Sequence, residues 1–143
     1  MPFDIDGGKE TLNPARKFDW DKEGKEWVKL RLPTDEDSRQ SFLKAGVEEK
    51  VEWRTVDKKT RQQQRVTYFD PTEAQKALFD EEMWDISISE WFLVKPNGEE
   101  IPSTRENKVV MMRYCPAFSA RVNQELEKMQ EDIKGYVEAS EKN

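Results

Sequence analysis

The residue types on which most protein chemistry relies are nearly absent from this sequence. Its 143 residues contain no histidine and a single cysteine, Cys115. The usual general base at neutral pH and the commonest transition-metal ligand are therefore missing. A zinc site or a Ser-His-Asp or Cys-His arrangement cannot be built from what remains. The six glycines form neither GxGxxG nor GxxxxGKS/T, so no phosphate-binding loop is indicated. We expect no catalytic activity, no metal and no cofactor.

Closely spaced carboxylates are the remaining candidates for acid–base or metal chemistry. They are Asp35/Asp37, Glu48/Glu49, Glu81/Glu82 and Glu99/Glu100. Neighbouring side chains on a helix point apart, and nothing in the sequence places two of these carboxylates in one pocket. We interpret them as solvated faces.

The composition favours a soluble chain with a modest core. Hydrophobic residues make up 35%, charged residues 38% and the net charge is −6, with a mean hydropathy of −1.00. This charge repels nucleic acids and anionic membranes on average. No run approaches the roughly 20 apolar residues of a membrane span, and the start lacks the pattern of a signal peptide. With a single cysteine as well, we expect a cytoplasmic protein without membrane contact.

The N-terminal part combines a polar segment with a strand pattern. Residues 1–25 are polar and contain turn-forming residues, which predicts an extended or flexible arm. Val28, Leu30 and Leu32 then alternate with basic residues. That period of two predicts a half-buried strand, which Pro33 ends.

A helix and two further strands are predicted next. Thr34 stands three positions before Asp37, a spacing close to a capping box, so a helix should begin here and run to about Ala45. Gly46 is a typical stop. The stretches VEWRTVDKK and QRVTYFD are rich in β-branched and aromatic residues, which predicts two strands joined by a long basic loop.

Helical patterns dominate the second half. Asp70-Pro71-Thr72-Glu73 predicts a helix start, and the apolar residues that follow recur at helical spacing until a turn at Pro96-Asn97-Gly98. They are Ala77, Leu78, Met83, Trp84, Ile88 and Trp91. Ser103 and Glu106 form a capping-box pattern before a short helix that Pro116 interrupts.

The cleanest amphipathic pattern lies at the C-terminus. From about Pro116 onward, apolar residues step by three or four positions, as one face of a helix requires. They are Phe118, Val122, Leu126, Met129, Ile133 and Tyr136 or Val137. We therefore predict a long amphipathic C-terminal helix.

Together these patterns predict an α+β fold. A small antiparallel sheet of two or three strands from the N-terminal half should pack with three or four helices, the last of them long and amphipathic. Residues 26–138 should form one domain, and residues 139–143 a disordered tail.

Two apolar groups are candidate protein-binding surfaces. The first contains Trp84, Trp91 and Phe92, since aromatic residues often dominate interfaces; the competing and favoured interpretation is a core role. The second is the C-terminal stripe of Phe118, Val122, Leu126, Met129 and Ile133, which can enter a partner's groove or cover this chain's own core. Because a long stripe on a small domain is easily covered by a second copy, we expect a homo-oligomer.

The segment 54–65 is a candidate nucleic-acid contact. It carries Arg54, Lys58, Lys59, Arg61 and Arg65 against only Asp57. Such a loop can contact phosphates, but a solvated loop explains it as well. Because the rest of the chain is acidic, we favour the solvated loop over nucleic-acid binding.

An ordered set of motifs in the second half resembles a known family. From Trp84 the chain reads WDISISEWFLVKPNGEEIPSTRENKVVMMRYCPAFSARVNQELEKM. A Trp-Asp precedes an Ile-x-x-Trp segment, an Asn-Gly turn, the phrase Ile-Pro-Ser-Thr-x-Glu-Asn-Lys, a Met-rich short helix and a Pro-Ala-Phe before the final helix. With the upstream phrase WVKLRLPTDED, this order resembles the tail assembly chaperones of long-tailed, non-contractile bacteriophages and their prophages.

The resemblance implies a role in assembly and no catalytic residues. Such a protein would bind the tape-measure protein, keep its long apolar helices soluble and help recruit the tail-tube protein. It would act in the host cytoplasm and be absent from the mature virion. The alternatives are another phage structural or connector protein, or a small nucleic-acid-binding regulator that uses residues 54–65.

Overall fold

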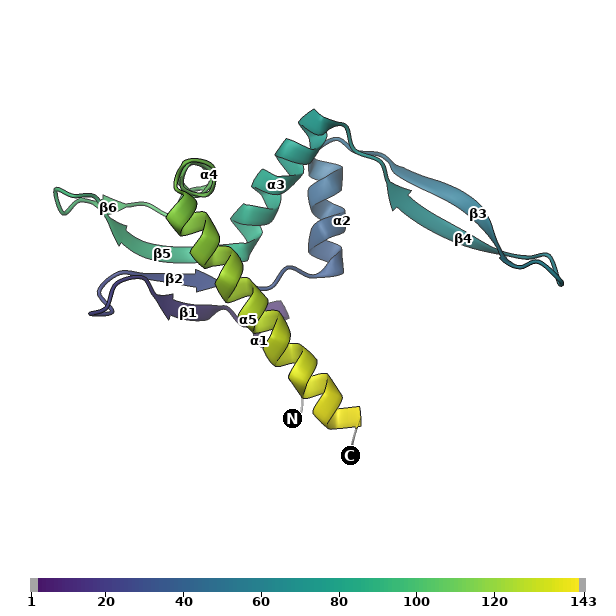
Figure 1. The fold of residues 1–143 in the computed structure, drawn as a ribbon, viewed down its shortest axis with the longest axis horizontal. Helices are drawn as coiled ribbons and strands as arrows, with labels where there is room; N and C mark the ends of the chain where they lie inside the picture. Colours follow the sequence, from purple (N-terminus) through teal and green to yellow (C-terminus); the bar gives the residue numbers. More distant parts are fainter. Residues whose placement is uncertain (1–2, 142–143) are drawn as a thin grey trace. The chain divides into compact units, whose positions relative to one another are not determined.

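The computed structural model describes residues 3–141 and divides them into two compact units (Figure 1). Unit 1 contains the described residues up to Pro33 and those from Trp84 onward, and unit 2 contains Thr34–Met83. Unit 2 is thus inserted into the chain of unit 1. The single domain expected over residues 26–138 stays a prediction.

Unit 1 is built on a four-stranded antiparallel sheet. Its strands are β1 (Arg16–Asp19), β2 (Trp27–Leu30), β5 (Ile88–Val94) and β6 (Glu100–Ile101), in the order β1-β2-β5-β6 (Figure 1). Residues of β2, and those of β5 from Glu90 onward, alternate between buried and more exposed positions, so one face of the sheet forms the core. Between Ile88 and Glu90 the pairing of β5 with β2 is irregular.

Helices cover that face and complete the unit. They are α4 (Arg105–Tyr114) and α5 (Pro116–Glu141), together with the end of α3 (Glu73–Ser87). The short α1 (Lys9–Leu12) also belongs to unit 1 but buries none of its residues. Side chains from α4 and α5 meet those of β2 and β5 in one cluster. It contains Val28, Leu30, Leu32, Ile88, Trp91, Leu93, Met112, Phe118, Val122 and Met129.

Unit 2 contains α2 (Asp35–Lys44), the hairpin of β3 (Glu49–Asp57) and β4 (Gln62–Phe69), and most of α3. Phe42 on α2 stacks on Phe69 at 4.8 Å and on Phe79 at 4.0 Å between ring centroids. This aromatic group joins both helices to the base of the hairpin. Beyond it the two strands extend as an isolated ribbon (Figure 1).

The α+β prediction is confirmed, as are several local signals. Thr34 and Asp37 form a complete capping box at the start of α2, and Gly46 follows the helix with a φ of 83°, the left-handed conformation that favours glycine. The long C-terminal helix begins at Pro116. The two strands around the basic segment also form, but their loop is shorter than expected because Gln62–Gln64 belong to β4.

The helix predicted through Trp91 is confirmed up to Ser87 and wrong beyond it. α3 ends at Ser87, and Ile88–Val94 form β5, which pairs with β2. Isoleucine and aromatic residues suit strands, and Ile88, Trp91 and Leu93 point into the core from an extended chain. The sheet therefore has four strands and draws two of them from the C-terminal half, not only from the N-terminal half as predicted.

Other boundaries also differ from the sequence predictions. Thr72, not Asp70, caps α3: it exchanges hydrogen bonds with Gln75 at 2.9 and 3.2 Å, the reciprocal geometry of a capping box. Thr104, not Ser103, caps α4. These side chains sit next to the first helical residue, where their oxygens reach the free backbone N–H groups.

Parts of both predicted terminal segments form regular secondary structure within the described residues. Within the expected arm of residues 1–25, Arg16–Asp19 form β1 on the edge of the sheet, and Phe18 and Trp20 pack on the core. Within the expected tail, residues 139–141 continue α5, because alanine and glutamate favour helix. Residues 142 and 143 lie outside the described residues.

Ser41 offers a test of packing in unit 2. Its side chain is fully buried on α2 and its Oγ has no hydrogen-bond partner within the described residues. An unpaired buried hydroxyl is unfavourable, and alanine is the better helix former, so Ser41→Ala should stabilise the unit by about 1 kcal/mol. Thermal unfolding followed by circular dichroism measures this. Thr34→Ala, which removes the capping box, should instead destabilise by about 1 kcal/mol, and a loss for Ser41→Ala would show that the hydroxyl is satisfied.

Candidate protein-binding surfaces

The predicted binding residues divide into buried and accessible ones. Trp91, Phe118, Val122 and Met129 are buried in the core of unit 1, and Trp84 and Leu126 pack against it. Phe92 and Ile133 are exposed. A partner that binds the folded chain can therefore reach the last two freely, whereas the first four hold the unit together.

Trp91 is fixed from several sides. Its indole Nε1 donates a hydrogen bond of 2.8 Å to the backbone oxygen of Ile101, and its ring meets Phe118 edge-on at 5.6 Å. The hydrogen bond joins the side chain of β5 to β6, so the tryptophan satisfies its polar atom while filling the core. Its geometry is that of a structural residue.

The apolar stripe of α5 changes from core to surface along the helix. Its first turns carry the buried Phe118 and Val122. Beyond Met129 the same stripe continues in side chains that are 53% exposed at Ile133 and 55% exposed at Tyr136. An apolar helical face that continues past its own core is available to another protein.

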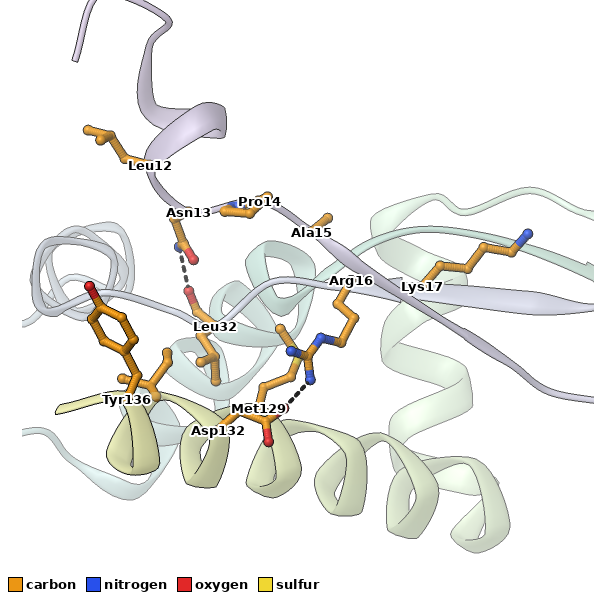
Figure 2. A pocket seen from close by; sticks show the side chains of 11 residues that line it. Leu12, Asn13, Pro14, Ala15, Arg16, Lys17, Leu32, Met129, Asp132 and Tyr136 are labelled. Carbon is orange, nitrogen blue, oxygen red and sulfur yellow. Dashed lines mark hydrogen bonds and ion pairs between the residues drawn. The ribbon is translucent and has the colours of Figure 1, made fainter. Parts of the chain in front are cut away.

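A pocket of about 710 Å³ lies beside this exposed part of the stripe. We call it the α5 pocket. Met129, Ile133 and Tyr136 form one wall, and the opposite wall comes from the segment that precedes and begins β1 (Figure 2). Its lining residues are Leu12, Asn13, Pro14, Ala15, Arg16, Lys17, Leu32, Met129, Asp132, Ile133 and Tyr136.

Polar contacts hold the N-terminal wall of the α5 pocket in place. Asn13 Nδ2 donates to the backbone oxygen of Leu32 at 2.8 Å, and Arg16 Nη1 lies 2.6 Å from Asp132 Oδ2 across the pocket (Figure 2). Both charged side chains are more than half exposed, so the ion pair itself contributes little stability. The pocket thus has apolar walls and one ion pair, Arg16–Asp132, that spans it.

Sequence patterns alone missed half of this pocket. Leu12, Pro14 and Ala15 fell within the expected arm, and nothing in their spacing indicates a wall. One signal was present: Phe18 and Trp20 alternate with Lys17 and Asp19, a period of two that predicts a strand with a buried face. A strand there requires the preceding residues to pass beside the sheet.

The basic segment 54–65 forms the distal part of the β3–β4 hairpin. Its tip is the turn at residues 58–61, where Asp57 Oδ1 accepts a hydrogen bond of 2.9 Å from the Lys59 backbone N–H and Arg61 has a φ of 54°. A non-glycine residue in the left-handed region is uncommon. The structure therefore makes the basic loop a short, defined turn on a ribbon.

The described residues present neither a cluster of metal-ligating side chains nor a bilayer-spanning helix. Among residues 3–141, no three Asp, Glu or Cys side chains group so that they could hold a metal ion. In the same range no helix is both long and apolar enough to cross a membrane. Comparisons with protein-family models, with curated proteins and with solved structures find no match for this chain.

Proposed function

We propose that this chain is a phage tail assembly chaperone that binds apolar helices of the tape-measure protein at the α5 pocket. The proposal rests on the motif order of the second half of the chain and on one structural observation. That observation is the apolar stripe of α5, which leaves the core at Met129 and continues beside an open pocket. By the same resemblance, the complex would help recruit the tail-tube protein.

The geometry suits an amphipathic helix as the client. Met129, Ile133 and Tyr136 are spaced four and three residues apart on α5, so they form one ridge, and Leu12 and Leu32 also line the pocket. A helix whose own apolar residues recur at this spacing can place them between the two walls. A client with exposed apolar helices gains most from such a surface, because burial removes those helices from water.

Charge on the remaining surface suits a solubilising role. Beside the pocket, α5 presents Glu127, Glu131 and Lys134 to solvent, and the chain as a whole has a net charge of −6. A complex in which the client's apolar face is buried and this charged face is outward resists aggregation.

The direct test is co-expression with a tape-measure fragment. The wild-type chain should raise the soluble fraction of the fragment several-fold over an empty vector. A variant with Ile133→Glu and Tyr136→Glu should lose most of this effect, because the two charges would be buried against the client. Both positions are more than half exposed, so the variant should keep its fold, which circular dichroism checks.

A matched control separates the pocket from general charge. Gln124→Glu and Gln130→Glu add the same charge at exposed positions of α5 outside the lining of the α5 pocket, and this variant should solubilise the fragment as well as wild type does. An unchanged insoluble fraction with the wild-type chain would reject the proposal. Equal loss in both variants would place the client elsewhere on the molecule.

Composition of the finished particle distinguishes a chaperone from a connector protein. Mass spectrometry of purified virions should find the tape-measure and tail-tube proteins but not this chain. Its presence at a fixed copy number would favour the alternative of a structural or connector protein.

A further inference from the structure

The β3–β4 hairpin buries very few of its residues against the rest of the chain. Every residue from Glu48 to Arg65 is exposed, and no third strand pairs with either edge within residues 3–141. Trp53 is 63% exposed. A two-stranded ribbon alone is only marginally stable in water, and an exposed edge with apolar residues invites pairing or docking. The ribbon therefore exposes strand edges and apolar side chains that no other part of residues 3–141 covers.

Its distal part, residues 53–65, is strongly basic, and we call it the basic ribbon. It carries five basic residues against one acidic residue, a formal charge of +4. Four of these cations make no ion pair with any described residue: Lys58, Lys59, Arg61 and Arg65. Charge that is not neutralised within the chain is available to an acidic partner.

One face of the ribbon combines this charge with apolar surface. Trp53 is directly opposite Arg65 in the antiparallel register, and Val51 lies two residues before Trp53. Alternate residues of a strand and their cross-strand partners share a face, so these three side chains lie together. Tryptophan and arginine are the residues that most often dominate the binding energy of interfaces. If the basic residues served only to keep a strand edge soluble, an exposed tryptophan beside them would have no role.

The rest of unit 2 has the opposite charge. Residues 34–52 and 66–83 contain eleven acidic against four basic residues, a formal charge of −7; we call this part the acidic base. On its helices, Asp35 and Asp80 are exposed and make no ion pair with any described residue. Leu43 on α2 and Leu78 on α3 are exposed as well. The base thus offers acidic and apolar groups, as the ribbon offers basic and apolar ones.

We infer that the basic ribbon docks onto the acidic base of a second copy of this chain. Both halves of the contact belong to the same compact unit, so every copy carries one of each. Trp53 and Val51 would cover apolar groups such as Leu43 and Leu78, while Lys58, Lys59 and Arg61 face carboxylates. Such a contact either exchanges ribbons between two copies or continues from copy to copy.

Charge complementarity favours a second copy over nucleic acid. A duplex that approached the ribbon would also meet the field of the acidic base, which repels phosphates. The base of a second copy attracts the ribbon and supplies the apolar counterpart that phosphates lack. This inference concerns unit 2 and does not depend on the client proposed for unit 1.

Complementary charge reversal tests the contact. Sedimentation velocity over a concentration series should show reversible self-association of the wild-type chain, weakened by added salt. A ribbon variant (Lys58→Glu, Lys59→Glu, Arg61→Glu) and a base variant (Asp35→Lys, Glu36→Lys, Asp80→Lys) should each associate at least about tenfold more weakly. An equimolar mixture of the two variants should associate again, because each reversed surface then meets its complement.

A control with the same charge change isolates the ribbon. Lys22→Glu, Lys25→Glu and Lys95→Glu alter exposed lysines of unit 1 and should leave association unchanged. A wild-type chain that stays monomeric at all concentrations, or a mixture that fails to associate, would overturn the inference. Salt-sensitive binding of a labelled duplex DNA that only the ribbon variant loses would overturn it in favour of nucleic acid. The ribbon variant should still solubilise the tape-measure fragment, so the two proposals fail independently.

Discussion

Phe118→Ala should lower the free energy of unfolding of unit 1 by about 3–5 kcal/mol. Phe118 is fully buried and is the largest of the fully buried side chains, with its ring 5.6 Å from those of both Trp20 and Trp91. Removing it leaves a cavity between α5 and the sheet, which neighbouring aromatic rings cannot fill without leaving their own contacts. Phe118→Leu, which keeps most of the volume, should cost less and remains measurable if the alanine variant does not fold.

Tryptophan fluorescence in urea can follow this loss in unit 1. Four of the five tryptophans belong to unit 1, and only Trp53 lies in unit 2. In a Trp53→Phe background, the tryptophan fluorescence therefore comes from unit 1 alone. The control is Phe92→Ala on β5, the same chemical change at a side chain that is 36% exposed, for which we expect about 1 kcal/mol. Equal losses at both positions would mean that Phe118 is not central to the core.

Lys108→Met should destabilise unit 1 by about 2 kcal/mol, the second largest effect that we expect. Lys108 is 5% exposed on α4. Its Nζ donates to Asp85 Oδ1 at 2.9 Å and to the backbone oxygen of Asp85 at 3.1 Å, near the C-terminal end of α3. Methionine keeps the apolar stem but leaves both oxygens without this donor. The Asp85 side chain is 38% exposed and can turn to water, so the loss should stay below that of a fully buried pair.

Lys29→Met is the matched control for this ion pair. Lys29 lies 2.9 Å from Glu90 Oε1, the same distance, but both side chains are more than a third exposed. Solvent weakens such a pair, so its loss should change stability by no more than about 1 kcal/mol. Urea unfolding of both variants gives the comparison. Similar values for Lys108 and Lys29 would show that burial adds nothing to the first pair.

The sequence predicted a helix correctly where residues close together in the chain determine it. The capping box at Thr34 and the period of the C-terminal stripe both led to the correct helices, because each depends on neighbours within a few residues. The segment Ile88–Trp91 was mispredicted because its spacing fits a helix, whereas pairing with β2, far away in the sequence, makes it a strand. Such long-range pairing overrides local preference.

The candidate surfaces were predictable only in part for the same reason. The stripe on α5 was identified residue by residue, but spacing cannot show that burial ends at Met129 and that Ile133 is exposed. The opposite wall of the α5 pocket depends on β1 and its hydrogen bonds to β2. Lys108 was likewise unpredictable as a core residue, because only the fold brings Asp85 beside it.

The insertion of unit 2 has a consequence for how this chain can vary. The chain leaves unit 1 after Pro33 and returns at Trp84. Close to these two points, the Arg31 N–H donates a hydrogen bond of 2.8 Å to the Ser87 backbone oxygen. The chain therefore leaves and re-enters unit 1 at adjacent ends of β2 and β5, which are antiparallel neighbours in the sheet. In topological terms unit 2 is an elaborated connection between these strands, of the kind that tolerates exchange. Evolution can lengthen, trim or replace it while the strand order of the sheet is preserved, so that one scaffold carries different appendages.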